Sequence, residues 1–189
     1  MSKTSVKKES TLMYVLRLTF TLLIITSVVA LALAGINQVT SPIIAAANEA
    51  KTQEAIEMVL PGGGSEIDFS DSTGLVTTVY KGESGYAVQV APSGFDGAID
   101  MMVGIDKAGK VIGISIISHA ETPSLGAVAA ENNAAGEAFR SQFAGLSGTL
   151  AVGKDGGTVD AISGATITSR AVVNGVNAAL QCVGKEVRS

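Results

Sequence analysis

The sequence of 189 residues contains one cysteine and one histidine. A single thiol cannot form an intrachain disulfide, and it cannot supply the ligands of a multi-cysteine metal site or an iron–sulfur cluster. Cys182 lies far from the apolar N-terminal segment, which excludes a lipoprotein anchor, and we expect it to be a small buried residue on a C-terminal helix. The single His119 argues against a zinc site made of protein ligands alone. We therefore predict no disulfide and no protein-bound metal.

Charged residues are also scarce, at 16% of the chain, whereas 47% of the residues are hydrophobic. No charged residue stands between Leu18 and Asn48, and the stretch Leu18–Ile36 is almost wholly apolar. The 19 residues of this stretch would rise about 28 Å as a helix, close to the roughly 30 Å hydrocarbon core of a bilayer. The sequence therefore predicts one membrane-spanning helix at residues 18–36.

A cleavable signal peptide is the alternative interpretation of this stretch. The small-x-small sequence Ala32–Ala34 resembles a cleavage site, and lysines precede the apolar residues. However, the stretch exceeds the roughly 7–15 apolar residues of a signal peptide, and no glycine or proline interrupts it before Gly35. We favour a retained anchor, and either interpretation sends the rest of the chain across the membrane.

The distribution of basic residues predicts the orientation. Those that precede or open the apolar stretch are Lys3, Lys7, Lys8 and Arg17. The next basic residue is Lys51, so the positive-inside rule places residues 1–17 in the cytoplasm and the remainder outside it. From residue 37 onward the chain has 9 Lys and Arg against 16 Asp and Glu, a net charge of −7. An acidic domain without basic runs argues against nucleic-acid binding.

The segment that follows the span predicts a stalk. Ser41 and Pro42 are typical of a helix start, so we expect a second helix within residues 37–61 that ends before Pro61. The glycine-rich residues 62–65 would then separate this stalk from a domain at residues 66–189.

This domain is predicted to be α+β, with an antiparallel sheet packed by helices. The sheet would come from four runs rich in Val, Ile, Thr and Tyr, at residues 75–82, 85–92, 98–106 and 109–119. In the fourth run we expect Val111 to face the same way as Ile117, and Ile112 the same way as Ile114. Helices are expected at residues 126–143 and 168–186, with a short strand at residues 149–152 between them.

The stretch Asp160–Thr168, "DAISGATIT", lies where a loop becomes the last helix. A helix start presents unpaired N–H groups and a positive dipole end, which suits a phosphate. Gly164 and Ala165 leave space for a close approach, and Ser163 can donate a hydroxyl hydrogen bond with Thr168. Serine and threonine also cap many helices, so these residues alone leave a plain helix start open.

Taken as Asp-x-x-Ser-Gly-Ala-Thr-x-Thr, the stretch resembles the flavinylation motif of the FMN-binding domain family. In that family a flavin transferase takes FMN from FAD and joins its phosphate to the second hydroxyl residue of the motif, here Thr166. The resemblance implies recognition and phosphate-cradling positions at Asp160, Ser163, Gly164 and Ala165, with Thr168 as a supporting donor. It also explains why no nucleophile–base pair stands beside Thr166, because the transferase supplies the chemistry; we predict no catalytic residue.

A second candidate site is "SHAETPSLG" at residues 118–126. Alone, His119 and Glu121 are a weak indication of acid–base chemistry. With residues 93–106 and 109–119, the segment resembles the G subunit of the Rnf electron-transport complex and the related C subunit of the sodium-pumping NADH:quinone oxidoreductase. Ser124 stands where those families have glycine, which puts a left-handed backbone there in doubt. The resemblance implies a flavin pocket lined by the following residues: His119, Glu121, Thr122, Leu125 and Gly126.

The resemblance implies a membrane-anchored electron carrier with covalent FMN, a redox subunit rather than a complete enzyme. Its partners would be Rnf subunits A, B, C, D and E, with a flavin transferase for maturation, in a ferredoxin:NAD oxidoreductase coupled to Na⁺ or H⁺ translocation. A stand-alone extracytoplasmic flavoprotein and a non-redox tethered binding domain are the alternatives. Arg170 and Lys154 are weaker candidates: Arg170 could pair with Asp160 or the phosphate, although a solvated surface arginine is favoured.

Overall fold

The computed structural model of the chain describes residues 11–186. Contacts divide the chain into two compact units, Met1–Ala47 and Asn48–Ser189. The first element, α1 (Thr11–Val59), has its side chains exposed from Met13 to Ala50. It is long and apolar enough to cross a membrane. Lys3, Lys7 and Lys8, on which the predicted orientation depends, lie outside the described residues.

The prediction of two separate helices is wrong, because Pro42 lies inside α1. Proline has no N–H for the helix ladder and normally marks a helix start. Here the alanine-rich residues 45–50 after Pro42 supply helix propensity, and the helix continues at the cost of one hydrogen bond. The predicted end holds, since α1 stops at Val59, two residues before Pro61.

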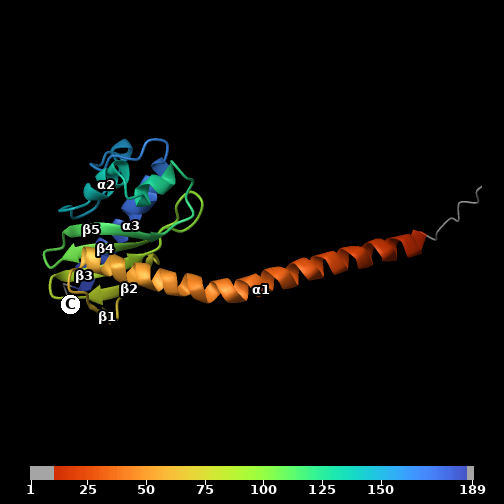
Figure 1. Cartoon of the computed structure of the whole chain (residues 1–189). Helices are drawn as coiled ribbons and strands as arrows, with labels where there is room; N and C mark the ends of the chain where they lie inside the picture. The colour runs from red at the N-terminus through yellow and green to blue at the C-terminus, as the bar shows by residue number, and fades with distance from the viewer. Residues whose placement is uncertain (1–10, 187–189) are drawn as a thin grey trace, which may run out of the picture. The chain divides into compact units, whose positions relative to one another are not determined.

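Among the described residues, five strands form one antiparallel sheet in the order β1-β2-β3-β4-β5 (Figure 1). Four of them confirm the predicted strands. The first was not predicted, because three mostly exposed residues carry no alternating pattern. The strands are β1 (Ser65–Ile67), β2 (Val76–Lys81), β3 (Gly85–Val90), β4 (Asp100–Asp106) and β5 (Val111–Ser118).

A register shift in β5 corrects the predicted faces of this strand. Ile105 pairs with Val111 while Gly104 pairs with Gly113, so Ile112 is an extra residue in the ladder. A bulge of this kind reverses which face the flanking side chains occupy. Val111 therefore shares a core with Ile114, and Ile112 is exposed.

The sheet carries a hydrophobic core on each face. On one face, Val88, Met101 and Val103 pack with the C-terminal helix α3 (Thr166–Glu186); on the other, Ala87, Met102 and Ile117 pack with the last turns of α1 (Figure 1). The alternation of neighbours such as Ala87 and Val88 between the two cores is the period of two expected of a strand. Ala55, Ile56 and Val59 of α1 lie in this core, together with Leu60, which directly follows the helix.

The predicted helix at residues 126–143 is two shorter elements, a 3₁₀ helix η1 (Gly126–Ala130) and α2 (Ala134–Ser141). Asn133 causes the break, because its side-chain oxygen accepts a hydrogen bond from the N–H of Gly136 and so caps a new helix start. The predicted strand at residues 149–152 is only a single bridge between Val152 and Val159.

The last predicted helix is confirmed as α3, which begins two residues earlier than expected and continues past Gly184. Its apolar face is buried as the spacing indicated, and Cys182 lies in that face at 2% exposure. The helix contacts β2, β3 and β4 of the sheet as well as η1, and its N-terminal end lies at the stretch singled out by sequence.

Candidate functional site

A cavity of about 260 Å³ lies at the N-terminal end of α3. Segments far apart in the sequence form its walls: the loop after β3, the segment after β5, the short 3₁₀ helix η2 (Gly153–Asp155), and the turn that opens α3. The lining residues are Phe95, Glu121, Thr122, Leu125, Gly126, Lys154, Gly164, Ala165, Thr166, Ile167 and Thr168. The two candidate segments, some forty residues apart in the sequence, thus form one site.

The turn before α3 is held by Ser169, a residue that the sequence analysis did not single out. Its buried hydroxyl accepts a hydrogen bond from the N–H of Ile162 (3.0 Å) and donates one to the carbonyl of Ala165 (2.9 Å). Gly164 in this turn has φ of 77°, a left-handed conformation that favours glycine. These contacts fix the backbone immediately before Thr166, the first residue of α3.

Thr166 is half-buried and lines the cavity. The Nζ of Lys154 donates a hydrogen bond to its Oγ1 at 3.1 Å. Thr166, Ile167 and Thr168 form the first helical turn, where N–H groups have no intrahelical acceptor and the dipole is positive. A lysine and a helix start together make this side of the cavity suited to an anionic group.

Glu121 is the buried charged group of the site, at 6% exposure. Its Oε2 accepts a hydrogen bond from the hydroxyl of Thr168 (2.6 Å), and its Oε1 accepts bonds from the N–H groups of Phe95 (2.7 Å) and Asp96 (3.3 Å). Both carboxylate oxygens are therefore satisfied within the protein, as a buried charge requires.

Ser124 adopts φ of 60°, so serine occupies the left-handed conformation at the position where the sequence left it in doubt. Such a conformation is uncommon for a residue other than glycine and costs free energy on the order of 1–2 kcal/mol. The turn nevertheless leads Leu125 and Gly126 into the cavity wall.

Three predicted site residues do not line this cavity. The side chain of Asp160 is exposed, and its backbone N–H and carbonyl bond the side chain of Gln142 at 2.7 and 3.2 Å. Ser163 is exposed. His119 lies beside a separate hollow with Lys51, where its Nδ1 accepts a hydrogen bond from the N–H of Glu121 at 3.2 Å.

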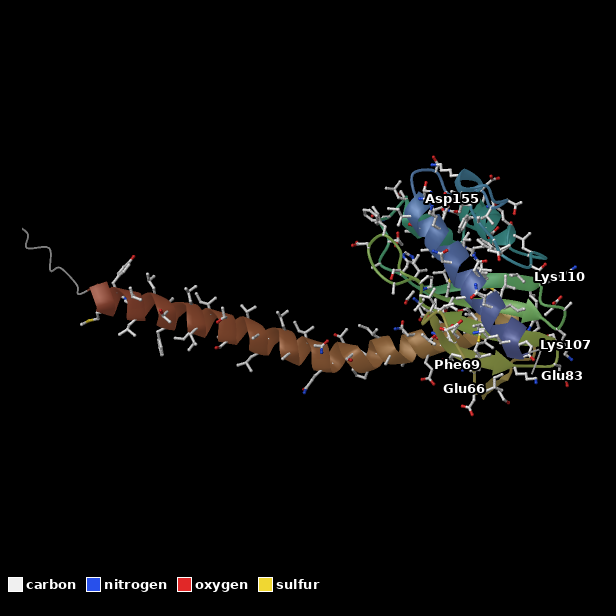
Figure 2. All side chains as sticks on the ribbon, turned by 180° about the vertical axis from the view of Figure 1, so that it is seen from behind. Glu66, Phe69, Glu83, Lys107, Lys110 and Asp155 are labelled. Carbon is white, nitrogen blue, oxygen red and sulfur yellow. The ribbon has the colours of Figure 1, made fainter. Side chains whose placement is uncertain are left out.

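Arg170 does not pair with Asp160. It forms a two-point ion pair with Asp155, with its Nη2 and Nε at 2.6 and 2.7 Å from the carboxylate oxygens. The hydrogen bond from Arg170 lowers the pKa of the Asp155 carboxyl, and the arginine side chain is 47% exposed, which agrees with the favoured surface interpretation. Figure 2 shows Asp155 at the N-terminal end of α3, far from Glu66 and Glu83.

Apolar side chains form the other part of the cavity wall: Phe95 at 66% exposure, Leu125 at 44% and Ile167 at 51%, here called the apolar rim. Sequence analysis missed Phe95 and Ile167 as site residues. An exposed aromatic residue between the glycines of Gly94–Gly97 was the available signal, because large apolar residues in exposed loops often mark ligand sites.

An anion-binding cradle, made of Lys154 and the start of α3, beside an apolar rim defines a domain suited to a ligand that joins a phosphate to a flat aromatic ring. A family model described as "FMN-binding domain" matches residues 94–181, which include every residue of the cavity wall. FMN has both chemical parts, so the residues present fit this cofactor.

Similar proteins identify the family of this chain more narrowly than the domain match does. The G subunit of the proton-translocating ferredoxin:NAD(+) oxidoreductase complex of Clostridium ljungdahlii is 35% identical, over 80% of this chain and 82% of the relative. The G subunit of the Na(+)-translocating ferredoxin:NAD(+) oxidoreductase complex of Acetobacterium woodii is 34% identical, over 88% and 90%. The G subunit of the ion-translocating oxidoreductase complex of Escherichia coli K12 is 35% identical, over 77% and 80%. The chain therefore belongs to the G-subunit family of ion-translocating oxidoreductase (Rnf) complexes, and the resemblance found in the sequence is confirmed.

Proposed function

We propose that this chain carries electrons within an Rnf-type ferredoxin:NAD oxidoreductase, through FMN joined by its phosphate to Thr166. The observation that carries the proposal is the position of Thr166: it lines a cavity of an FMN-binding domain on the first turn of α3, and its Oγ1 lies 3.1 Å from the Nζ of Lys154. A phosphodiester on this oxygen would lie beside a lysine and the positive end of a helix.

The attachment balances as a phosphoryl transfer. The Oγ1 of Thr166 attacks the FMN-side phosphorus of FAD, an oxygen–phosphorus bond forms, the pyrophosphate bond breaks, and AMP leaves. The hydroxyl proton passes to the flavin transferase, so the domain itself need not supply a general base; Glu121 in the cavity wall is engaged by Phe95, Asp96 and Thr168.

In this proposal the N–H groups of the first turn of α3 and the ammonium of Lys154 hold the phosphate, and the apolar rim holds the ring. Bound FMN supplies one- and two-electron redox chemistry. The protein fixes the place of that chemistry and limits access of water to it. Asp160 and Ser163, exposed and outside the cavity wall, fit positions that a transferase reads on the surface.

The names of the relatives support the wider role. Those from Clostridium ljungdahlii and Acetobacterium woodii belong to complexes of ferredoxin:NAD(+) oxidoreductase that translocate protons and Na⁺, respectively. We infer that this chain works with subunits A, B, C, D and E of such a complex. The apolar α1 is proposed as its single membrane anchor, with residues 1–17 cytoplasmic, residues 37–61 as a stalk, and the FMN-binding domain at residues 66–189 outside the cytoplasm.

Co-expression of the full chain with a flavin transferase tests the proposal. After denaturing electrophoresis, wild type should retain flavin fluorescence and the added mass of FMN, whereas Thr166→Ala should retain neither. Thr158→Ala, which alters an exposed threonine outside the cavity wall, is the matched control and should load fully. Flavin on denatured Thr166→Ala would overturn the attachment site. Isolation of loaded protein from membranes without other subunits would favour a stand-alone flavoprotein.

A further inference from the structure

The carboxylate of Glu121 joins three segments that surround the cavity. Its hydrogen bonds reach the loop after β3, through the N–H groups of Phe95 and Asp96, and the first turn of α3, through the hydroxyl of Thr168. Glu121 itself stands in the segment after β5. The bonded residues are 25 to 47 positions apart in the sequence, so this contact fixes tertiary structure rather than a local turn.

Two glycines make room for this carboxylate. A Cβ on Gly94 would overlap the Oε1 of Glu121, and a Cβ on Gly126 would overlap its Oε2 and lie 2.5 Å from the Oγ1 of Thr168. The carboxylate is therefore enclosed from two sides, at 6% exposure. Interiors packed this closely leave a side chain one position, so the hydrogen bonds of Glu121 have a fixed direction.

One of these donors is the backbone N–H of Phe95, a residue of the apolar rim that is 66% exposed. An exposed aromatic ring on a loop has little packing of its own to hold it. The bond to Glu121 fixes the backbone that carries this ring, and the bond to Thr168 ties the same carboxylate to the turn that carries Thr166.

We propose that Glu121 is a positioning residue that holds Phe95 at a fixed place relative to the first turn of α3. A flavin ring tethered at Thr166 then meets a fixed aromatic wall on one side of the cavity. Glu121 acts through Phe95 and not as a ligand of the ring, since both of its oxygens already accept bonds from the protein. This inference rests on the proposed function, because it requires FMN at Thr166.

The test uses the full chain, loaded with FMN by co-expression and kept in detergent, and measures quenching of flavin fluorescence by iodide together with fluorescence anisotropy. In Glu121→Ala we expect the quenching constant to rise several-fold and the anisotropy to fall, with flavin still attached after denaturation. Phe95→Ala should give the same changes. Because Glu121 acts through Phe95, the double variant should be no more accessible to iodide than Phe95→Ala alone.

Glu121→Gln separates hydrogen bonding from charge. Its amide oxygen can accept the bonds from Phe95 and Asp96, and its NH₂ can donate to the Oγ1 of Thr168, so quenching should stay near the wild-type value. Glu137→Ala, an exposed acid in the first turn of α2, is the matched control. Wild-type quenching in Glu121→Ala, effects that multiply in the double variant, or equal effects of Gln and Ala would overturn the proposal.

If Glu121→Ala does not accumulate as folded protein, Thr168→Val replaces it in the quenching experiment. Valine lacks the hydroxyl that donates to Glu121 but keeps the shape of the threonine side chain. This variant should raise iodide quenching, and no change would count against the proposal. Loss of flavin from denatured wild type is a separate outcome that rejects covalent attachment. It is distinguishable because the quenching comparison is made only on chains that retain flavin.

Discussion

The Nζ of Lys154 lies 3.1 Å from the Oγ1 of Thr166, and both side chains line the same cavity. The neighbouring acid, Asp155, is engaged by Arg170. The ammonium of Lys154 is thus directed to the oxygen that we propose to be phosphorylated by FMN attachment, in a domain that is otherwise acidic.

Replacing this lysine should slow flavin attachment. Lys154→Met removes the cation that offsets the phosphate, and we expect a several-fold lower initial rate of labelling with transferase and FAD, followed by fluorescence on denaturing gels. Lys154→Arg should restore most of the rate. Lys107→Ala removes an exposed lysine at the β4–β5 turn, away from Asp155 (Figure 2), and should label as wild type does. Equal rates in Lys154→Met and Lys107→Ala would show that the contact has no part in attachment.

Substitution of Gly126 should destabilise the domain. In Gly126→Ala the new methyl group would overlap the carboxylate of Glu121, and we expect a loss of about 1–3 kcal/mol in the free energy of unfolding. Gly113→Ala is the matched control, because a Cβ there meets nothing within 4 Å. Urea unfolding of the full chain in detergent gives both values, and a loss in Gly113→Ala as large as that in Gly126→Ala would contradict this explanation.

The site shows what the sequence could and could not specify. Residues such as Thr166 and Gly126 were found because their types and spacing match family motifs. Phe95 was not, because its role depends on which segments meet in space, and Ser169 was not, because its role depends on the backbone conformation of the turn at residues 162–165. The partner of Arg170 illustrates the same limit: Asp160 and Asp155 were both within reach in the sequence, and the fold selects Asp155.

The fold shows the same division. Strands with several alternating residues, such as β3 and β4, were predicted because periodicity is local information. The bulge at Ile112 was not, since an extra residue in a ladder is defined only by the partner strand. The continuation of α1 through Pro42 was missed because a local rule for helix starts was outweighed by the helix propensity of the alanine-rich residues 45–50 that follow.

Acid should lower the stability of the fold through Asp71, in the loop between β1 and β2. Burial by itself raises the pKa of Asp71, but hydrogen bonds from the N–H and hydroxyl of Thr73 and the N–H of Val76 outweigh it and lower the pKa from 3.8 to about 2. A carboxyl with a lowered folded pKa stabilises the fold above its unfolded value and loses this contribution as the pH falls through the folded value.

The stability difference between wild type and Asp71→Asn should therefore be full above about pH 4 and shrink as the pH falls toward 2. Thermal unfolding at a series of pH values measures it. Asp68→Asn, an exposed acid outside this hydrogen-bond set, is the control. A difference that stays constant between pH 4 and pH 2 would contradict the role given to Asp71.

The N-terminal segment should remain on the mature protein as a membrane anchor. Residues 13–50 of α1 are exposed and mostly apolar up to Ala47, so this segment requires lipid or another partner to cover it. We expect the full chain to stay in the membrane pellet after alkaline carbonate extraction, with an intact mass that includes residues 1–34. Ala34→Leu, which abolishes the small-x-small sequence Ala32–Ala34, should leave the length of the chain unchanged. Cleavage of a signal peptide would instead give wild type a shorter chain and Ala34→Leu the full one.

A chain that begins at Asn48 keeps the unit with its own core and should be recovered folded without the membrane. A reporter enzyme active only outside the cytoplasm, fused to the C-terminus, should be active in the full chain if residues 1–17 are cytoplasmic, and inactivity would reverse the proposed orientation.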